Sequence, residues 1–432
     1  MILPARPEVG YELYLSNNSG ISGKLRKKID DFRVEEIIEK NEQSHWNWTK
    51  KEENGKHCIA KITADNWDTH ILVKKISQQL GIGQRAVGFA GTKDKRAVTT
   101  QYFSLFTSPE KLSKIDLKQI EIEFLHKTTK PIRLGNLIGN KFLIKISEIS
   151  GSKSDISTIL NELKEGFPNY FGIQRFGAIR PITHIVGKKI VKGDCEGAVW
   201  DYLTKEGSSN QNTEARKFLR ENRNLEIALE KFPPNLFFER QMIKHLIKNE
   251  NDYIGALKKL PENLSKMLVH SYQSLIFNSA LNERIARGLG VTKPIVGDKV
   301  MPMDKYGGPD QRKIIEVTDR NLNKLEKRCK EGKAWIVGLL PGIKSRHSNG
   351  LQSEIESTIM KNEEVEFKDF KIDMLPELSS LGMYRPLSQR VNELDWKVDS
   401  SGNAIFTFWL HKGTYATSFL REIMKCKDVK NY

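Results

Sequence analysis

The chain has 432 residues, of which 38% are hydrophobic and 29% are charged, so it is long enough for two or three domains and too apolar for a disordered chain. It holds no run of about 18 apolar residues, which excludes a transmembrane helix. Lysine and arginine number 70 against 54 acidic residues, a net charge of +16. Such an excess is typical of proteins that bind nucleic acid, although solubility alone also explains it.

The first 190 residues predict a sheet with few helices. Alternating apolar residues predict strands around 32–34 and 58–62, and further strands are expected at 86–90, 99–106 and 141–146. A helix is expected over 71–80, with Asp68 or Thr69 as N-cap and Gly81 at its end, and another over 155–164.

The pattern becomes helical near residue 190 and stays so until about 380. The clearest helix is expected from an N-cap at Asn263 to about Arg287. We expect strands and turns at 291–343 and an exposed, charged segment at 361–373.

Strand character returns near the end of the chain, at 404–410. An amphipathic helix is expected after it, at 415–425, with Thr414 or Thr417 as its cap. This order of elements predicts one α+β domain that is interrupted by a second.

Sequence patterns for metals and cofactors are missing. The cysteines form no CxxC pair, the histidines form no HxxxH pair, and there is no GxxxxGK[ST] loop. We therefore expect no metal and no cofactor. The first nine residues lack the apolar stretch of a signal peptide, so we expect a cytoplasmic protein with reduced cysteines.

Three segments carry residues suited to chemistry. In GFAGTKDKRAVTTQ (88–101), Asp94 lies between Lys93 and Lys95, which favours its ionised form and also attracts phosphate. In PNYFGIQRFG (168–177), aromatic residues alternate with arginine, as in platforms that stack unpaired bases. Each segment also has a plain structural interpretation, as a solvated turn and as core anchors respectively.

The third segment, LHKGTYATSFLRE (410–422), lies where a strand is expected to give way to a helix. A helix N-terminus presents free backbone N–H groups to an anion, and Tyr415 stands at this junction. A capped helix with no further role explains the same residues.

Together with IDDFRVEE (29–36) and HSYQSLIFN (270–278), these segments resemble the motifs of the TruD family of tRNA pseudouridine synthases. They follow the family's order and span nearly the whole chain. His411 stands where the family has proline, and Thr414 stands where it has serine.

The resemblance implies a fold of the α+β class. A pseudouridine synthase catalytic domain with a central mixed, largely antiparallel sheet would be interrupted by an inserted α/β TRUD domain. We expect the catalytic domain in residues 1–190 and 381–432 and the insertion in residues 191–380. The implied partner is tRNA, with no membrane and no small-molecule cofactor, and a monomer is expected.

The resemblance also implies the reaction, which is isomerisation of a uridine in tRNA, at position 13, to pseudouridine. It makes Asp94 the catalytic carboxylate, either as a nucleophile at C1′ or as a base at the ribose. An ungapped alignment places Arg26 at the family's candidate for the cation that pairs with this aspartate. The other implied substrate-binding residues provide stacking, hydrogen bonds or phosphate contacts: Lys93, Lys95, Asn169, Phe171, Arg175 and Tyr415.

Two other functions stay open at this point. A non-catalytic RNA-binding protein would use the same basic surface without needing Asp94. A glycosidase would release the base by hydrolysis and would need a second carboxylate near Asp94, for which Glu36 is a candidate.

Overall fold

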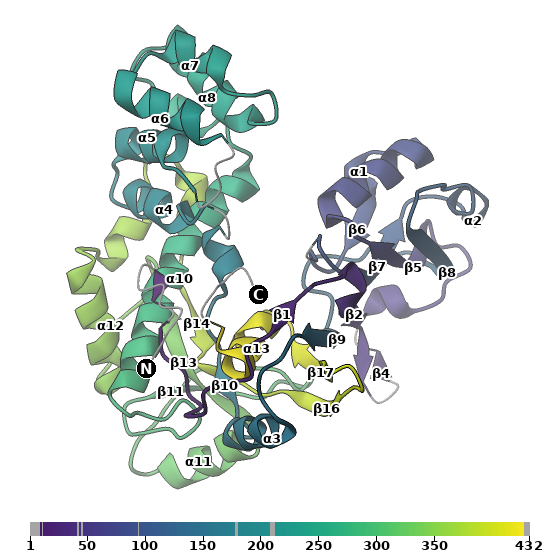
Figure 1. Cartoon of the computed structure of the whole chain (residues 1–432), viewed down its shortest axis with the longest axis vertical. Coiled ribbons are helices and arrows are strands. Elements are labelled where there is room, and N and C mark those ends of the chain that lie inside the picture. Colours follow the sequence, from purple (N-terminus) through teal and green to yellow (C-terminus); the bar gives the residue numbers. More distant parts are fainter. Residues whose placement is uncertain are drawn as a thin grey trace.

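The computed structural model of the chain describes residues 9–10, 12–40, 43–44, 46–93, 95–177, 180–207 and 212–426. These residues form a mixed α/β protein with one large mixed sheet and smaller antiparallel sheets. Figure 1 shows the large sheet on one side and a group of helices, α4 to α8, at one end.

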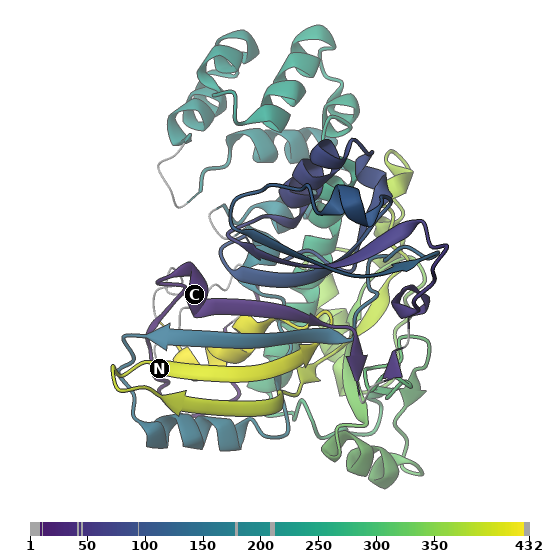
Figure 2. The same ribbon diagram turned by 90° about the vertical axis from the view of Figure 1, so that its right-hand side faces the viewer.

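The large sheet joins segments from both ends of the chain. Its strand order over the described residues is β16-β17-β9-β2-β7-β5-β8, with β1 beside β9 and β6 beside β7. The pairing of β2 with β7 is parallel, and the other pairings between these strands are antiparallel. Figure 2 shows β16 and β17 (yellow) beside β9 and β2. The strands are β1 (Lys24–Leu25), β2 (Phe32–Ile37), β5 (His57–Asp65), β6 (Val87–Phe89), β7 (Val98–Leu105), β8 (Ile120–Thr128), β9 (Gly139–Ser147), β16 (Asn392–Val398) and β17 (Ala404–His411).

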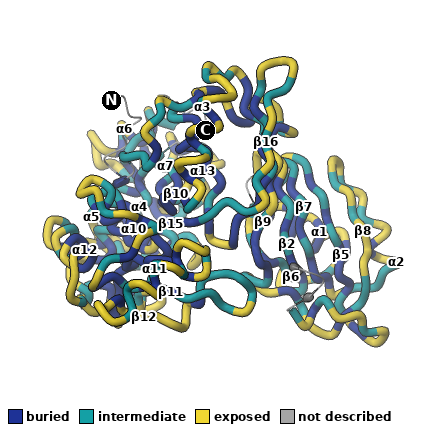
Figure 3. The backbone as a smooth tube through the Cα atoms, turned by 90° about the horizontal axis from the view of Figure 1, so that it is seen from below, coloured by how far each residue is buried: buried dark blue, intermediate teal, exposed yellow. Residues whose placement is uncertain are grey.

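Helix α1 (Thr69–Leu80) covers the β5–β7 half of this sheet and follows the sequence prediction. The Asp68 carboxylate accepts from two free backbone N–H groups at its N-terminus, and Gly81 ends the helix with φ of +65°. Leu72 and Ile76 pack into the core beneath it. Figure 3 shows buried residues in blue along β2, β7 and β9.

The β2–β9–β17 half is covered by α3 (Lys153–Glu162) and α13 (Ala416–Met424). The predicted cap of α13 is wrong, because Tyr415 holds the N-cap position and no side chain caps the helix. Its polar residues are also buried. Arg421 donates to the carbonyl oxygens of residues 12 and 13, and Glu422 accepts from the N–H groups of Leu15 and Ser16.

The middle of the chain has its own core, built by helices around α10 (Glu262–Ala286). This helix begins after Pro261 rather than at the predicted Asn263, since proline suits a helix start and Asn263 stays exposed. The other helices of this region are α4 (Thr183–Val191), α5 (Cys195–Thr204), α6 (Thr213–Asn222), α7 (Leu225–Lys231), α8 (Phe237–Lys248), α9 (Tyr253–Leu257), α11 (Leu322–Lys330) and α12 (Leu351–Asn362).

Two predictions for this region need correction. Residues 291–343 contain the helix α11 besides strands, and its buried Leu325 and Cys329 lie on one face. The segment 361–373 is not wholly exposed, because Phe370 and Ile372 are buried in the helical core.

The smaller sheets are antiparallel. One has the order β12-β11-β13-β14, so β14 is at an edge, and another pairs β10 with β15. Among the described helices, none is long and apolar enough to cross a membrane. The remaining strands and short helix are β3 (Glu39–Lys40), β4 (Gln43–Ser44), β10 (Phe167–Pro168), β11 (Lys299–Pro302), β12 (Ile315–Glu316), β13 (Ala334–Leu340), β14 (Met383–Pro386), β15 (Ser388–Gln389) and α2 (Pro109–Leu112).

Candidate active site

The turn between β6 and β7 carries Asp94, which itself lies outside the described residues. Its neighbour Lys93 is buried, and the Lys93 Nζ lies 2.5 Å from Oε1 of the buried Glu36. The second Glu36 oxygen accepts from the backbone N–H of Tyr102 at 3.0 Å. Lys93 is therefore held in a buried ion pair rather than presented to solvent.

Two polar side chains hold the backbone of this turn. Gln101 on β7 donates to the carbonyl oxygen of Gly91 at 2.7 Å, and the hydroxyl of Thr69 accepts from the Lys93 N–H at 2.9 Å. Thr69 opens α1 and also donates to Gln101 at 3.2 Å. The chain before Asp94 is thus fixed by a helix terminus and two strands.

Arg26 lies beside the other end of the turn. Arg96 donates to the Arg26 carbonyl oxygen at 2.8 Å, and the Arg26 guanidinium lies 4.1 Å from the ring centroid of Phe32. The backbone of Arg26 has φ of +55°, which is uncommon for a residue with a side chain. The side chains of Lys95 and Arg96 are exposed, so this end of the turn presents positive charge to solvent.

A cavity of about 450 Å³, here called the first cavity, opens beside Lys93. Four of the motif segments contribute to its wall, through Phe32, Lys93, Arg175 and Tyr415. Met267 of α10 adds an apolar side chain. The first cavity is therefore where distant motifs of the sequence meet, next to the turn of Asp94.

The Asn169–Gly177 motif is anchored from α10. Asn278 is fully buried, and its amide accepts from the Phe171 N–H at 2.9 Å and donates to the Phe171 carbonyl oxygen at 3.0 Å. The Phe171 ring is also buried and makes edge contacts with Phe277 and Tyr415. Phe171 is thus a member of a core in this structure.

Arg385 of β14 connects two motifs and was not identified from the sequence. Its guanidinium donates to Oδ1 of Asn169 at 2.7 Å and to the Gly413 carbonyl oxygen at 2.9 Å. It also lies 4.0 Å from the centroid of the Phe171 ring. Burial lowers the pKa of Arg385 to about 10, which leaves it protonated at neutral pH. No pattern in the sequence marks this arginine, because its partners Asn169 and Gly413 are 216 and 28 residues away in the chain.

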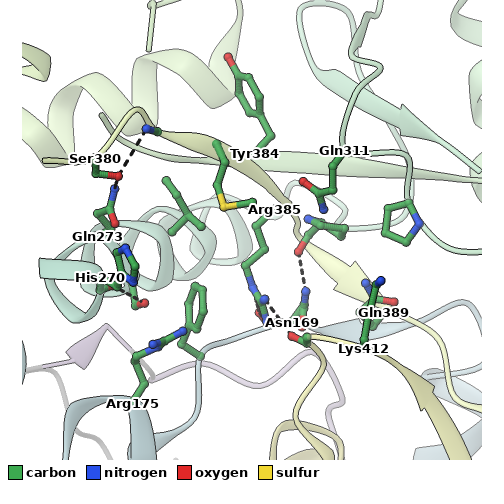
Figure 4. A pocket seen from close by; sticks show the side chains of 18 of the residues that line it. Asn169, Arg175, His270, Gln273, Gln311, Ser380, Tyr384, Arg385, Gln389 and Lys412 are labelled. Carbon is green, nitrogen blue, oxygen red and sulfur yellow. Dashed lines mark hydrogen bonds between the residues drawn. The ribbon is translucent and has the colours of Figure 1, made fainter. Parts of the chain in front are cut away.

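Arg385 lies in a further cavity of about 360 Å³, here called the second cavity (Figure 4). The structure places Asn169 and Phe171 here, and not in the first cavity. The Asn169 amide is occupied, since it also donates to the Pro386 carbonyl oxygen at 2.9 Å. Arg175 lines both cavities. In the described part of the chain, no group of three or more His, Cys, Asp or Glu side chains is placed to hold a metal ion.

Comparisons with known proteins identify the family of the chain. The family model of tRNA pseudouridine synthase D (TruD) matches residues 8–423. A Methanosarcina acetivorans protein called "Probable tRNA pseudouridine synthase D" is 37% identical over 97% of this chain and 96% of its own length. A Pyrococcus furiosus protein of the same description is 36% identical over 96% of this chain and 99% of its own length.

A solved structure leads to the same assignment. A crystal structure described as "Putative tRNA pseudouridine synthase D (TruD) from Methanosarcina mazei" is similar with a TM-score of 0.81 and 37% identity, over 97% of both chains. The chain therefore belongs to the tRNA pseudouridine synthase D (TruD) family, and it is an intramolecular isomerase that acts on tRNA.

Proposed function

We propose that this enzyme converts the uridine at position 13 of tRNA to pseudouridine, with Asp94 as the catalytic carboxylate. The observation that carries the proposal is the first cavity, where Phe32, Lys93, Arg175 and Tyr415 meet beside the turn of Asp94. In the reaction the bond between C1′ and N1 breaks, the uracil turns, and a bond forms between C1′ and C5. The proton on C5 is lost and N1 gains one, so no cofactor has to be oxidised or reduced.

The first cavity supplies what such a step needs around the carboxylate. Extrusion of a base costs a few kcal/mol, and stacking on an aromatic ring returns about 1–3 kcal/mol. Tyr415 is half-buried and lines the cavity, so we assign the stacking role to it. Phe171 is assigned a positioning role, because its ring is covered by Arg385.

Asp94 needs a cation nearby to stay ionised and oriented. We propose Arg26 for this role, because its backbone is bonded to Arg96, two residues after Asp94. Lys93 is a poorer choice, since its charge is already matched by Glu36. Lys95 is exposed and is proposed to contact phosphate.

Hydrolysis of the glycosidic bond is disfavoured by the position of Glu36. A glycosidase needs a second carboxylate that reaches water beside the sugar. Glu36 is close to the turn in space, but it is buried and bonded to Lys93 and to the Tyr102 N–H. It therefore has no access to a water molecule that would attack C1′.

The domain organisation is part of the proposal. We propose that residues 1–190 and 381–432 form the catalytic domain and that residues 191–380 are the inserted TRUD domain. The pairing of β17 with β9 supports this division, as does the separate core of the α10 region. We further propose a monomer, and a cytoplasmic enzyme, since its four cysteines are free and buried.

The test is pseudouridine mapping of unmodified tRNA after treatment with the wild-type enzyme and the Asp94→Asn variant. The wild-type enzyme is expected to modify uridine 13, and the variant is expected to bind tRNA within a few-fold of wild type without modifying it. Modification by the variant near the wild-type rate would exclude Asp94. Release of free uracil instead of pseudouridine would show hydrolysis.

A further inference from the structure

We propose that the second cavity binds an unstacked nucleobase that neighbours the target uridine in the same RNA strand. The inference rests on the proposed function, because it requires a uridine in the first cavity. The two cavities share Arg175 and Gly413 as common wall. A strand that delivers its uridine to the first cavity therefore brings an adjacent nucleotide to the entrance of the second.

The second cavity has the size and position of a binding site. Its volume of about 360 Å³ falls within the range typical of small-ligand pockets. Figure 4 shows Arg385 at its centre, with Arg175, His270 and Gln273 on one side and Gln311, Gln389 and Lys412 on the other. Its wall thus combines cations with neutral amides, which suits a base joined to phosphate.

Apolar surfaces for stacking are present in the edge strand β14 and just before it. Leu381 and Met383 both line the second cavity, yet they are 57% and 53% exposed. Arg385 follows them, and one face of its planar guanidinium lies against the Phe171 ring. Arginine planes and apolar side chains are surfaces on which unpaired bases stack. Large apolar side chains left exposed beside a cavity indicate that something covers them.

Two polar atoms of the cavity wall are unpaired among the described residues. Gln389 is 3% exposed, and its buried Oε1 has no hydrogen-bond partner. The buried Nε of Arg175 also has none. A buried polar group without a partner is unfavourable, so a ligand that forms a hydrogen bond to it is stabilised. The acceptor and the donor lie on opposite sides of Arg385, and a nucleobase carries donors and acceptors on more than one edge.

A protein segment is a poorer occupant. A peptide that extends the sheet at β14 would pair with the backbone of that strand. It would leave Gln389 and Arg175 unpaired, because both lie outside β14. The unpaired side chains therefore favour a nucleobase.

The experiment measures binding of unmodified tRNA transcripts to enzyme in the Asp94→Asn background, so that no turnover intervenes. One transcript is intact, and two others carry an abasic nucleotide on either side of the mapped uridine. One of the abasic transcripts is expected to bind about 5- to 150-fold more weakly, the equivalent of one base stack. In enzyme that also carries Gln389→Met or Met383→Ala, the second cavity no longer holds the base. The abasic and intact transcripts are then expected to differ in affinity by about twofold or less.

Matched controls separate this result from a change in fold. Met374→Ala replaces another exposed methionine, outside the cavity, and is expected to keep the full abasic penalty. Equal abasic penalties with and without the cavity substitutions would overturn the inference. A second contrary result would combine two observations. Adenosine 5′-monophosphate would protect the Met383 backbone amide from hydrogen exchange, and neither abasic transcript would bind more weakly than the intact one. That result would indicate a site for a free nucleotide. If wild-type enzyme forms no pseudouridine, the proposed function fails first and the inference fails with it.

Discussion

Lys93 donates to Glu36 across 2.5 Å at a place where both side chains are shielded from solvent. The contact fastens the turn of Asp94 to β2, and the parallel pairing of β2 with β7 brings the two strands together. Because the pair is buried, removing either partner alone leaves an uncompensated charge in the interior.

We therefore expect Lys93→Met to lower the free energy of unfolding by about 3–5 kcal/mol. The double variant Lys93→Met/Glu36→Gln is expected to recover part of this loss, since the amide still accepts from Tyr102 and no charge remains unpaired. Chemical denaturation of both variants measures the difference. A double variant that is no more stable than Lys93→Met alone would show that an unpaired buried charge is not the cause of the loss.

Tyr415 and Phe171 are expected to differ in what their removal changes. Tyr415→Ala should weaken tRNA binding by about 1–3 kcal/mol, because a base loses its stacking partner, and Tyr415→Phe should retain it. Phe171→Ala should lower the free energy of unfolding by about 3–5 kcal/mol, because the ring is part of a core. Titration with tRNA and denaturant unfolding distinguish the two. Weaker binding of the Phe171 variant at unchanged stability would make that ring a substrate contact.

The exposed Lys95 tests whether positive charge beside Asp94 contacts the phosphates of tRNA. Residues 191–380 carry 31 basic and 28 acidic residues, so most of the net +16 lies outside this region. Lys95→Met should reduce the slope of log K against log salt concentration by about 0.7–0.9, the value for one phosphate contact. The exposed Lys397 on β16 serves as a control and should leave the slope unchanged after Lys397→Met. An unchanged slope for Lys95→Met would exclude a phosphate contact there.

Glu356 predicts a dependence of stability on pH. Burial raises the pKa of this carboxyl from 4.5 to about 6, although Gln352 and the Leu339 N–H donate to it. The folded state then binds more protons than the unfolded state between these values. The free energy of unfolding should therefore fall by about 2 kcal/mol as pH rises from below 4.5 to above 6.

Glu356→Gln should remove this fall, since the amide is neutral at every pH in the range. The exposed Glu354 lies two residues away on the same helix, and Glu354→Gln should keep the wild-type profile. Thermal unfolding at several pH values from 4 to 7 gives the measurement. A profile of Glu356→Gln that parallels wild type would assign the dependence to other groups.

Local signals in the sequence predict much of the secondary structure. Asp68 and Gly81 bound α1 because capping depends on backbone groups within a few residues. The strands β2 and β5 follow from alternating apolar residues. The prediction fails where tertiary contacts decide. Phe370 and Ile372 occur in a charged segment, yet they are buried because helices of the middle region cover them.

The sequence predicts the candidate site as a set of motifs, and the structure divides their residues between two cavities. Lys93, Arg175 and Tyr415 line the first cavity, whereas Asn169 and Phe171 belong to the second. Asn278 belongs to a predicted motif but had no assigned role, and Arg385 was not predicted at all, because their partners are 107 and 216 residues away in the sequence. Contacts between residues so far apart in the sequence depend on the tertiary structure, and local sequence patterns do not predict them.

The pairing of β17 with β9 bears on how the chain is synthesised. Strand β9 ends at Ser147, but its antiparallel neighbour begins only at Ala404. During translation one edge of β9 therefore stays unpaired for tens of seconds at the usual rate of elongation, until β17 has been synthesised. An unpaired edge is prone to aggregation over such times. The nascent enzyme should consequently depend on chaperones more than its size suggests, and truncation before residue 404 should produce insoluble protein.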